Sequence, residues 1–196
     1  MQEILEQTTW QEWLGVTFSI IQVLLARKNN SNTYLFGIAG ILLSLYVMFF
    51  AKLYAEFTLN LYYLVMSIYG WIYWKFGREK TPPKISKTNH QEKIITGLIV
   101  LVSFGIFWMC LTHFTDSDVP ILDSLVSAFA WAGMWLMARR KIENWIFLNM
   151  SNSIAIPLLI HKELYLYAFL TIFLFVVAVL GYIEWRKIIK KTSYAV

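Results

Sequence analysis

Charged residues and cysteine are both scarce in this sequence. Only 15% of its 196 residues are charged and 58% are hydrophobic, whereas about 25% are charged in a typical soluble domain. A chain of this composition cannot cover its apolar surface with polar side chains, so we expect a lipid bilayer to be part of its surroundings. The single cysteine, Cys110, excludes an intrachain disulfide and a metal site built from several thiolates.

Motifs of common enzymes are also missing. The three histidines, His90, His113 and His161, are not spaced as metal ligands, and no metalloprotease, serine-nucleophile or phosphate-loop motif occurs. We therefore predict that the chain is not an enzyme and needs no metal or cofactor. The net charge of +5 does not indicate a nucleic-acid partner, because membrane proteins concentrate Lys and Arg in their cytoplasmic loops.

Most of the sequence consists of long apolar runs. A helix needs about 20 apolar residues to cross the hydrocarbon core, with about 17 as a workable minimum. Seven runs approach or exceed this length: Trp10 to Ala26, Tyr34 to Phe50, Leu53 to Trp74, Ile94 to Thr112, Ile121 to Ala138, Trp145 to Ile160 and Leu164 to Trp185.

Loop charge supports this count, because the loops after odd-numbered spans must all lie on one side of the membrane. Of the 17 Lys and Arg residues, only Lys52 and Lys162 fall on the opposite side. By the positive-inside rule, the N-terminus lies outside and the C-terminus in the cytoplasm. Removing one internal span would destroy this segregation.

The sequence also contains an internal repeat. The stretch from Gly70 to Lys75 has the same pattern as the stretch from Gly181 to Arg186, 111 positions later, and the segment beginning at Ala26 matches the one beginning at Ala138 at a displacement of 112. Several matches at nearly one displacement favour duplication.

A three-helix unit ends on the side opposite to its start, so a fourth helix is needed to give a second unit the same orientation. We predict an all-α polytopic membrane protein with seven transmembrane helices in a 3+1+3 arrangement of parallel repeats. The boundaries are 1–75 for the first repeat, 76–120 for a cytoplasmic linker and linker helix, and 121–196 for the second repeat and tail. Such repeats are typical of transporters with a substrate site near mid-membrane, between the halves.

Polar and aromatic residues recur at helical spacing along the third run, and Asn60 and Tyr63 lie deepest among them. The corresponding stripe on the seventh run includes Tyr167. We expect both stripes to face protein rather than lipid. Four further aromatic residues close to the ends of these runs are interpreted as members of the interfacial belt: Trp71, Trp74, Tyr182 and Trp185.

Two more groups of residues are candidates for ligand binding. Trp131 and Trp135 are four residues apart and present two rings in one direction, which suits a flat or cationic ring, although bundle packing explains them equally well. Asn149 and Asn152 lie within the sixth run. Asparagine in hydrocarbon is costly without a partner, so this cluster indicates helix–helix hydrogen bonds or, as we favour, a hydrated ligand cavity. The runs carry charge only near their ends, which favours facilitated diffusion over ion-coupled pumping.

The stretch from Leu53 to Trp71, LYAEFTLNLYYLVMSIYGW, resembles the signature of the PnuC vitamin-transporter family, as does the run from Ala138 to Trp145. The resemblance covers about Ala26 to Lys187. It implies a pseudo-symmetric bundle similar to the SWEET sugar transporters, a homotrimer, and a place in the bacterial inner membrane. It also implies uptake of nicotinamide riboside by uncoupled diffusion, followed by trapping through a cytoplasmic kinase. The family's ligand contacts fall on Asn60, on the tryptophans of the fifth run and on the polar cluster of the sixth.

Two departures from the family pattern lie where substrate selectivity is set. Asn60 stands in place of an expected glutamine, and Asn152 in place of a frequent aspartate. Related members carry thiamine or deoxynucleosides, so another cationic aromatic vitamin, thiamine above all, is the alternative substrate. A membrane sensor that binds the vitamin without translocating it is a further alternative.

Overall fold

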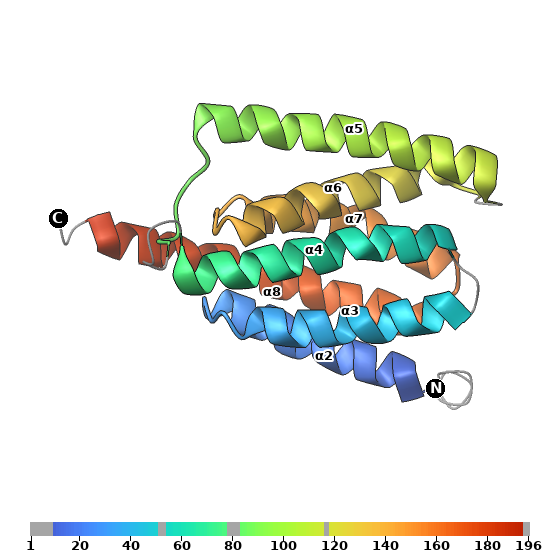
Figure 1. The fold of residues 1–196 in the computed structure, drawn as a ribbon, viewed down its shortest axis with the longest axis horizontal. Helices are drawn as coiled ribbons and strands as arrows, with labels where there is room; N and C mark the ends of the chain where they lie inside the picture. The colour runs from blue at the N-terminus through green and yellow to red at the C-terminus, as the bar shows by residue number, and fades with distance from the viewer. Residues whose placement is uncertain (1–9, 51–53, 78–82, 116–117, 194–196) are drawn as a thin grey trace. The chain divides into compact units, whose positions relative to one another are not determined.

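The computed structural model describes residues 10–50, 54–77, 83–115 and 118–193. Within these ranges the chain forms seven α-helices, and its extended backbone is limited to one isolated bridge (Figure 1). The helices are α2 (Trp10–Arg27), α3 (Thr33–Phe50), α4 (Tyr54–Phe76), α5 (His90–Phe114), α6 (Pro120–Ala138), α7 (Asn144–His161) and α8 (Tyr165–Ser193). Lys52 and Leu53, both used above, lie outside the described residues.

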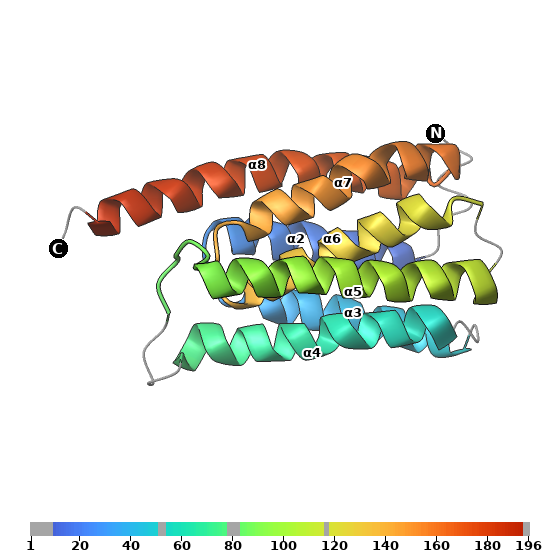
Figure 2. The same ribbon diagram turned by 90° about the horizontal axis from the view of Figure 1, so that it is seen from above.

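The helices follow the predicted apolar runs, and two of them extend clearly beyond those runs. Helix α5 begins four residues early because Asn89 and Glu92 form a capping box, in which each side chain accepts a hydrogen bond from the other residue's backbone N–H. Helix α8 continues from Trp185 to Ser193, since Arg, Lys and Ile sustain a helix beyond the apolar region. Figure 2 shows this end of α8 continuing past the start of α7.

The chain divides into two compact units, residues 1–83 and 84–196. In the first unit, α3 packs against both α2 and α4. In the second, α5, α6, α7 and α8 pack against one another in chain order. The division falls inside the predicted linker region, and the linker helix α5 belongs to the second unit.

The turn between α2 and α3 has the same backbone form as the turn between α6 and α7. Asn29 and Arg140 both adopt positive φ, at 56° and 59°. The N–H of Asn29 donates to Ala26 O over 2.9 Å, and the N–H of Arg140 donates to Met137 O over the same distance. The structural repeat therefore runs at a displacement of 111 through this turn, one residue away from the sequence match at 112.

Aromatic packing repeats at the same displacement. In the first unit, Tyr34 meets Trp74 edge to face, with ring centroids 5.2 Å apart. In the second unit, the equivalent residues Trp145 and Trp185 meet edge to face at 5.5 Å. Trp74 and Trp185 are only 2% and 0% exposed, so the interpretation of these two as interfacial belt residues is wrong. They are core residues, each within its own unit.

Among the described residues, four helices are long and apolar enough to cross a membrane: α3, α5, α6 and the part of α8 up to Lys191. Several apolar helices of this length indicate a multi-pass membrane protein. Helix α7, which contains three asparagines and two serines, is not among these four. That α2, α4 and α7 also cross, as the 3+1+3 arrangement requires, stays a prediction.

A short extended segment fastens the start of α5 to the turn between α6 and α7. Ser86 O accepts from Ile142 N over 3.0 Å, and Ser86 N donates to Arg140 O over 3.3 Å. Two residues on, the N–H of Thr88 donates to both carboxylate oxygens of Glu143, each over 3.1 Å. These bonds satisfy backbone groups on both segments and hold α5 to the second repeat. We call residues 84–89 with this turn the linker clasp.

Candidate functional site

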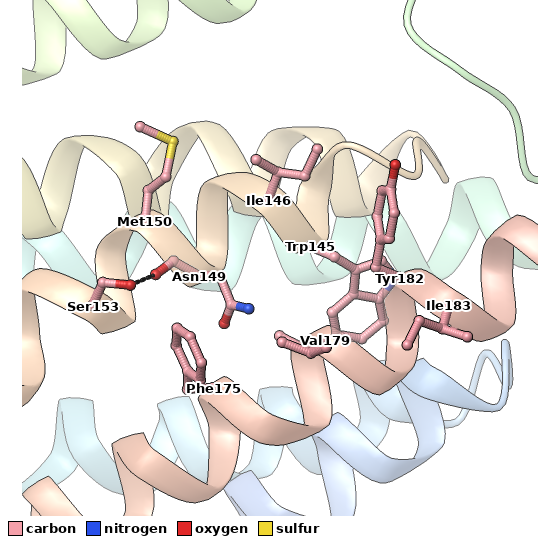
Figure 3. A pocket seen from close by; sticks show the side chains of 10 residues that line it. Trp145, Ile146, Asn149, Met150, Ser153, Phe175, Val179, Tyr182 and Ile183 are labelled. Carbon is pink, nitrogen blue, oxygen red and sulfur yellow. Dashed lines mark hydrogen bonds between the residues drawn. The ribbon is translucent and has the colours of Figure 1, made fainter.

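A groove of about 390 Å³ lies between α7 and α8, within the second unit. Figure 3 shows Asn149 reaching from α7 toward α8 in this groove, with Phe175 and Val179 nearby. Its lining is mostly apolar and aromatic, and none of the lining residues carries a charge: Trp145, Ile146, Asn149, Met150, Ser153, Phe175, Ala178, Val179, Tyr182 and Ile183.

The two asparagines predicted on the sixth span lie together. Asn152 Nδ2 donates to Asn149 Oδ1 over 3.5 Å, one helical turn apart on α7. Ser153 Oγ donates to the backbone O of Asn149 over 2.7 Å, so this hydroxyl is already engaged. Asn149 is thus the amide side chain that lines the groove, and Asn152, which does not line it, is the hydrogen-bond partner of Asn149.

Other polar residues of α7 have packing roles. Ser151 is buried, and its hydroxyl donates to Val126 O on α6 over 2.8 Å. Asn144 is fully buried and donates through Nδ2 to Lys141 O in the turn before α7. Part of the polar cluster therefore makes the helix–helix and turn contacts that the sequence left open as the alternative to a cavity.

The two tryptophans of α6 have different neighbours. Trp131 meets Phe107 of α5 edge to face, with centroids 4.8 Å apart. One helical turn later, the guanidinium carbon of Arg139 lies 5.4 Å from the ring centroid of Trp135. Neither tryptophan lines the groove between α7 and α8, and their predicted stacking on substrate stays a prediction.

Arg139 and Lys141 also bind one carboxylate. Arg139 Nη2 lies 3.3 Å from Glu92 Oε1, and Lys141 Nζ lies 2.9 Å from Glu92 Oε2. The Glu92 side chain is 6% exposed. A buried carboxylate needs such partners, because an uncompensated charge is costly away from water.

Three predicted site residues lie elsewhere. On α4, in the first unit, Asn60 Nδ2 donates to Met48 Sδ over 3.4 Å, and the half-buried Tyr63 meets the ring of Tyr62 at 6.0 Å. Tyr167 lies in the first turn of α8, and the groove uses a later part of that helix, from Phe175 to Ile183. Of the seven predicted site residues, only Asn149 lines the groove.

Sequence reasoning did not select three aromatic residues of the groove as site residues: Trp145, Phe175 and Tyr182. Tyr182 was assigned to the interface, and Trp145 marked the start of a span and the end of a stretch that resembles the family. For two of them the repeat was an available signal, since Trp145 occupies the position of Tyr34, and Tyr182 that of Trp71.

Comparison with known proteins identifies the family. The model of the family described as "Nicotinamide mononucleotide transporter" matches residues 9–187. The chain belongs to this family. The resemblance to PnuC transporters drawn from the sequence is thereby confirmed, and with it the assignment as a membrane transporter.

Relatives of this family member are named "Nicotinamide riboside transporter PnuC". The Neisseria mucosa protein is 26% identical over 209 residues, which cover 94% of this chain and 75% of that protein. The Escherichia coli protein is 21% identical over 203 residues, covering 90% and 85%. A solved structure titled "Crystal structure of the Vitamin B3 transporter PnuC" shares the fold, with a TM-score of 0.74 and 22% identity over 96% of this chain and 85% of that one.

Proposed function

We propose that this family member carries nicotinamide riboside into the cell, as the names of its relatives suggest for those proteins. The observation that carries the proposal is an aromatic, uncharged groove with the amide of Asn149 inside it. Nicotinamide riboside is a cationic pyridinium joined to a ribose. Aromatic faces attract such a ring, and an amide can both donate to and accept from hydroxyl or carboxamide groups.

The same groove favours nicotinamide riboside over nicotinamide mononucleotide, the compound that appears in the description of the family. The mononucleotide adds a phosphate, which proteins recognise with Arg, Lys or clustered backbone N–H groups. The lining of this groove supplies no Lys or Arg. A phosphate placed there would lose its hydration without gaining a charged partner.

Transport is proposed to be uncoupled diffusion, with net uptake driven by phosphorylation of the vitamin by a cytoplasmic kinase. The charge distribution supports an external N-terminus and a cytoplasmic C-terminus in the bacterial inner membrane. Assembly as a homotrimer rests on the family resemblance alone, and cross-linking of the purified protein tests it.

Flux into liposomes tests the function. Purified protein is reconstituted, and uptake of labelled nicotinamide riboside is followed without any ion gradient. We expect equilibration to the external concentration, with little competition from a tenfold excess of nicotinamide mononucleotide. Strict dependence on a proton or sodium gradient would reject the mechanism, and binding without flux would identify a sensor.

Thiamine is the second candidate. It is also a cationic aromatic vitamin, and Asn60 and Asn152 differ from the family pattern at positions expected to set selectivity. Competition between the two vitamins in the same liposomes decides between them. If thiamine blocks uptake and is itself carried while nicotinamide riboside is not, the substrate assignment is wrong and the transporter assignment stands.

A further inference from the structure

Four cations follow the apolar part of α8 without interrupting the helix. All four are exposed: Arg186, Lys187, Lys190 and Lys191. The segment from Glu184 to Lys191 contains one carboxylate beside them, so its net charge is +3. Figure 2 shows this end of α8 continuing past the start of α7. A cationic surface therefore stands where the helix leaves its apolar part.

Other basic residues of the second unit have partners within the protein. Arg139 and Lys141 bind Glu92 over 3.3 and 2.9 Å, and Lys162 binds Asp123 over 2.8 Å. Among the residues that the structure describes, no carboxylate pairs with the four cations of α8 and no aromatic ring lies under them. Their charge is available to a partner outside the chain.

The lysines of this surface lie in line with an exposed apolar row on the same helix. The row recurs at intervals of three and four residues: Phe169, Ile172, Val176 and Leu180. At about 100° per residue, Lys187, Lys190 and Lys191 project within about 60° of the mean direction of this row. One face of α8 is thus apolar along its length and cationic at its C-terminal end. We call the apolar row and the three lysines the α8 face.

The length of α8 matches the thickness of a bilayer. Its 29 residues extend about 43 Å, and a bilayer measures about 40–45 Å with its headgroups. The apolar part, from Tyr165 to Trp185, extends about 31 Å, close to the roughly 30 Å of the hydrocarbon core. When α8 crosses the membrane, its lysines therefore lie at the level of the headgroups, and their flexible stems let the ammonium groups reach phosphates there.

We propose that the α8 face binds anionic phospholipids. Their acyl chains lie along the apolar row, and their headgroup phosphates bind Lys187, Lys190 and Lys191. Anionic lipids attract basic residues that follow a membrane-spanning helix, whereas a zwitterionic headgroup cancels much of its own phosphate charge. The proposal goes beyond the transport of a vitamin and is independent of which vitamin is carried, since it requires only that α8 crosses the membrane.

A lipid bound at this face holds α8 at a fixed depth. Basic residues at the membrane surface act as anchors that set the depth and tilt of a spanning helix. Helix α8 also forms one wall of the groove, from Phe175 to Ile183. The lipid contact therefore steadies this wall from the side of the membrane.

Native mass spectrometry of the full-length purified protein tests the proposal. Protein in a neutral detergent is mixed with equal amounts of anionic phosphatidylglycerol and zwitterionic phosphatidylcholine that have the same acyl chains. The ratio of the two lipid adducts is the readout, because a change that merely loosens the fold alters both adducts. An excess of glycerol phosphate, which has the charge of the headgroup but no acyl chains, should leave the adducts unchanged and so distinguishes a membrane lipid from a soluble phosphate compound.

Replacing Lys187 and Lys191 together by glutamine removes two lysines that lie one helical turn apart on the α8 face. We expect the preference for phosphatidylglycerol to fall about 5- to 25-fold, at up to roughly 5-fold per lysine. Replacing both by arginine keeps the charge and should retain most of the preference. The matched control replaces Lys84 and Lys87 by glutamine, two exposed lysines of an extended segment that belongs to no helix. It should leave the preference nearly unchanged.

Several results would overturn the proposal. An unchanged ratio in the glutamine variant of α8 is one, and a lowered unfolding midpoint beside it would show that these lysines serve the C-terminal dipole of the helix instead. A fall of the same size in the control is another, because the preference would then follow total charge. Displacement of phosphatidylglycerol by glycerol phosphate is a third.

A double variant that does not fold leaves the measurement possible. Lys187→Gln and Lys191→Gln are then measured singly, each with an expected fall of up to roughly 5-fold. An unchanged ratio in both single variants overturns the proposal. None of these results bears on vitamin transport, which the flux into liposomes tests separately.

Discussion

The backbone of Gly181 lies directly against the indole of Trp145. A Cβ placed on Gly181 would come within 2.7 Å of ring atoms Cε2 and Cζ2 of Trp145, closer than real contacts allow. The indole cannot easily retreat, because Trp145 is 1% exposed and also packs against the fully buried Trp185. Glycine at 181 therefore sets the distance between α7 and α8 and with it the width of the groove.

Gly181→Ala should destabilise the protein, because the added methyl group overlaps a ring that has no room to move. Forcing extra volume into a packed core costs about 1–3 kcal/mol. Thermal unfolding in detergent measures the loss. Gly97→Ala in α5 is the matched control, since no atom lies within 4 Å of the Cβ position there, and alanine favours a helix more than glycine does. Equal stability of the two variants would contradict the packing described.

A second contact between a small and a large residue occurs in both repeats, but the positions of the small and the large residue are exchanged. Gly37 packs against Gln22, whereas at the positions 111 later Leu148 packs against Gly133. The later of the two positions is glycine in the first unit, whereas the earlier one is glycine in the second. The duplicated contact has been kept while its large and small partners have been exchanged.

This exchange predicts different tolerance to the same substitution. In Gly37→Ala the new methyl group meets the end of the Gln22 side chain, with Nε2 at 2.8 Å, and this end can rotate away. In Gly133→Ala it meets Leu148 Cγ and Cδ2 at 2.8 Å and the Leu148 backbone N at 3.1 Å. We expect Gly133→Ala to lower the unfolding midpoint clearly and Gly37→Ala only slightly. Adding Leu148→Ala should recover part of the loss in Gly133→Ala, and a purely additive double variant would refute the contact.

Sequence alone was sufficient for the positions of the helices, because each described helix coincides with a long apolar run bounded by charge or turn residues. It failed at two ends for identifiable reasons. The start of α5 depends on a capping box formed by Asn89 and Glu92, which is a local signal that hydropathy does not register. The end of α8 extends to Ser193 because charge ends an apolar run without ending a helix.

The site was less predictable because its residue types have several uses. Trp74 and Trp185 are of a residue type, and at a position near the end of an apolar run, that are typical of the membrane interface, yet both are buried. A buried tryptophan and an interfacial one are distinguished only by tertiary packing, here by the glycines that lie against the aromatic partners of these two tryptophans. Likewise Asn149 and Ser151 are equally polar neighbours on α7, but Asn149 lines the groove and Ser151 bonds to α6.

The linker clasp predicts a stability effect at Glu143. Glu143→Ala removes both acceptors of the Thr88 N–H and leaves this half-buried donor without its partners. A hydrogen bond to a charged group contributes about 1.5–3 kcal/mol, and partial exposure places the expected loss at the lower end. Glu143→Gln keeps one oxygen acceptor and should lose less. Hydrogen exchange of the Thr88 amide provides the local measurement, and unchanged protection in Glu143→Ala would mean that the clasp does not hold this segment.

Asn149→Ala should weaken vitamin binding without loosening the bundle. The substitution removes the one amide that lines the groove, and a missing hydrogen bond to a ligand hydroxyl or carboxamide costs about 1–2 kcal/mol, roughly a 5- to 30-fold rise in the dissociation constant. Stability should change little, since the Asn149 side chain is half-buried and its bond to Asn152 is long at 3.5 Å. Ser153→Ala is the comparison, because Ser153 also lines the groove but its hydroxyl already donates to the backbone O of Asn149. Calorimetric titration beside thermal unfolding separates the two effects. Wild-type affinity in Asn149→Ala would place the vitamin elsewhere in the protein, whereas a loss confined to that variant would assign the α7–α8 groove to binding.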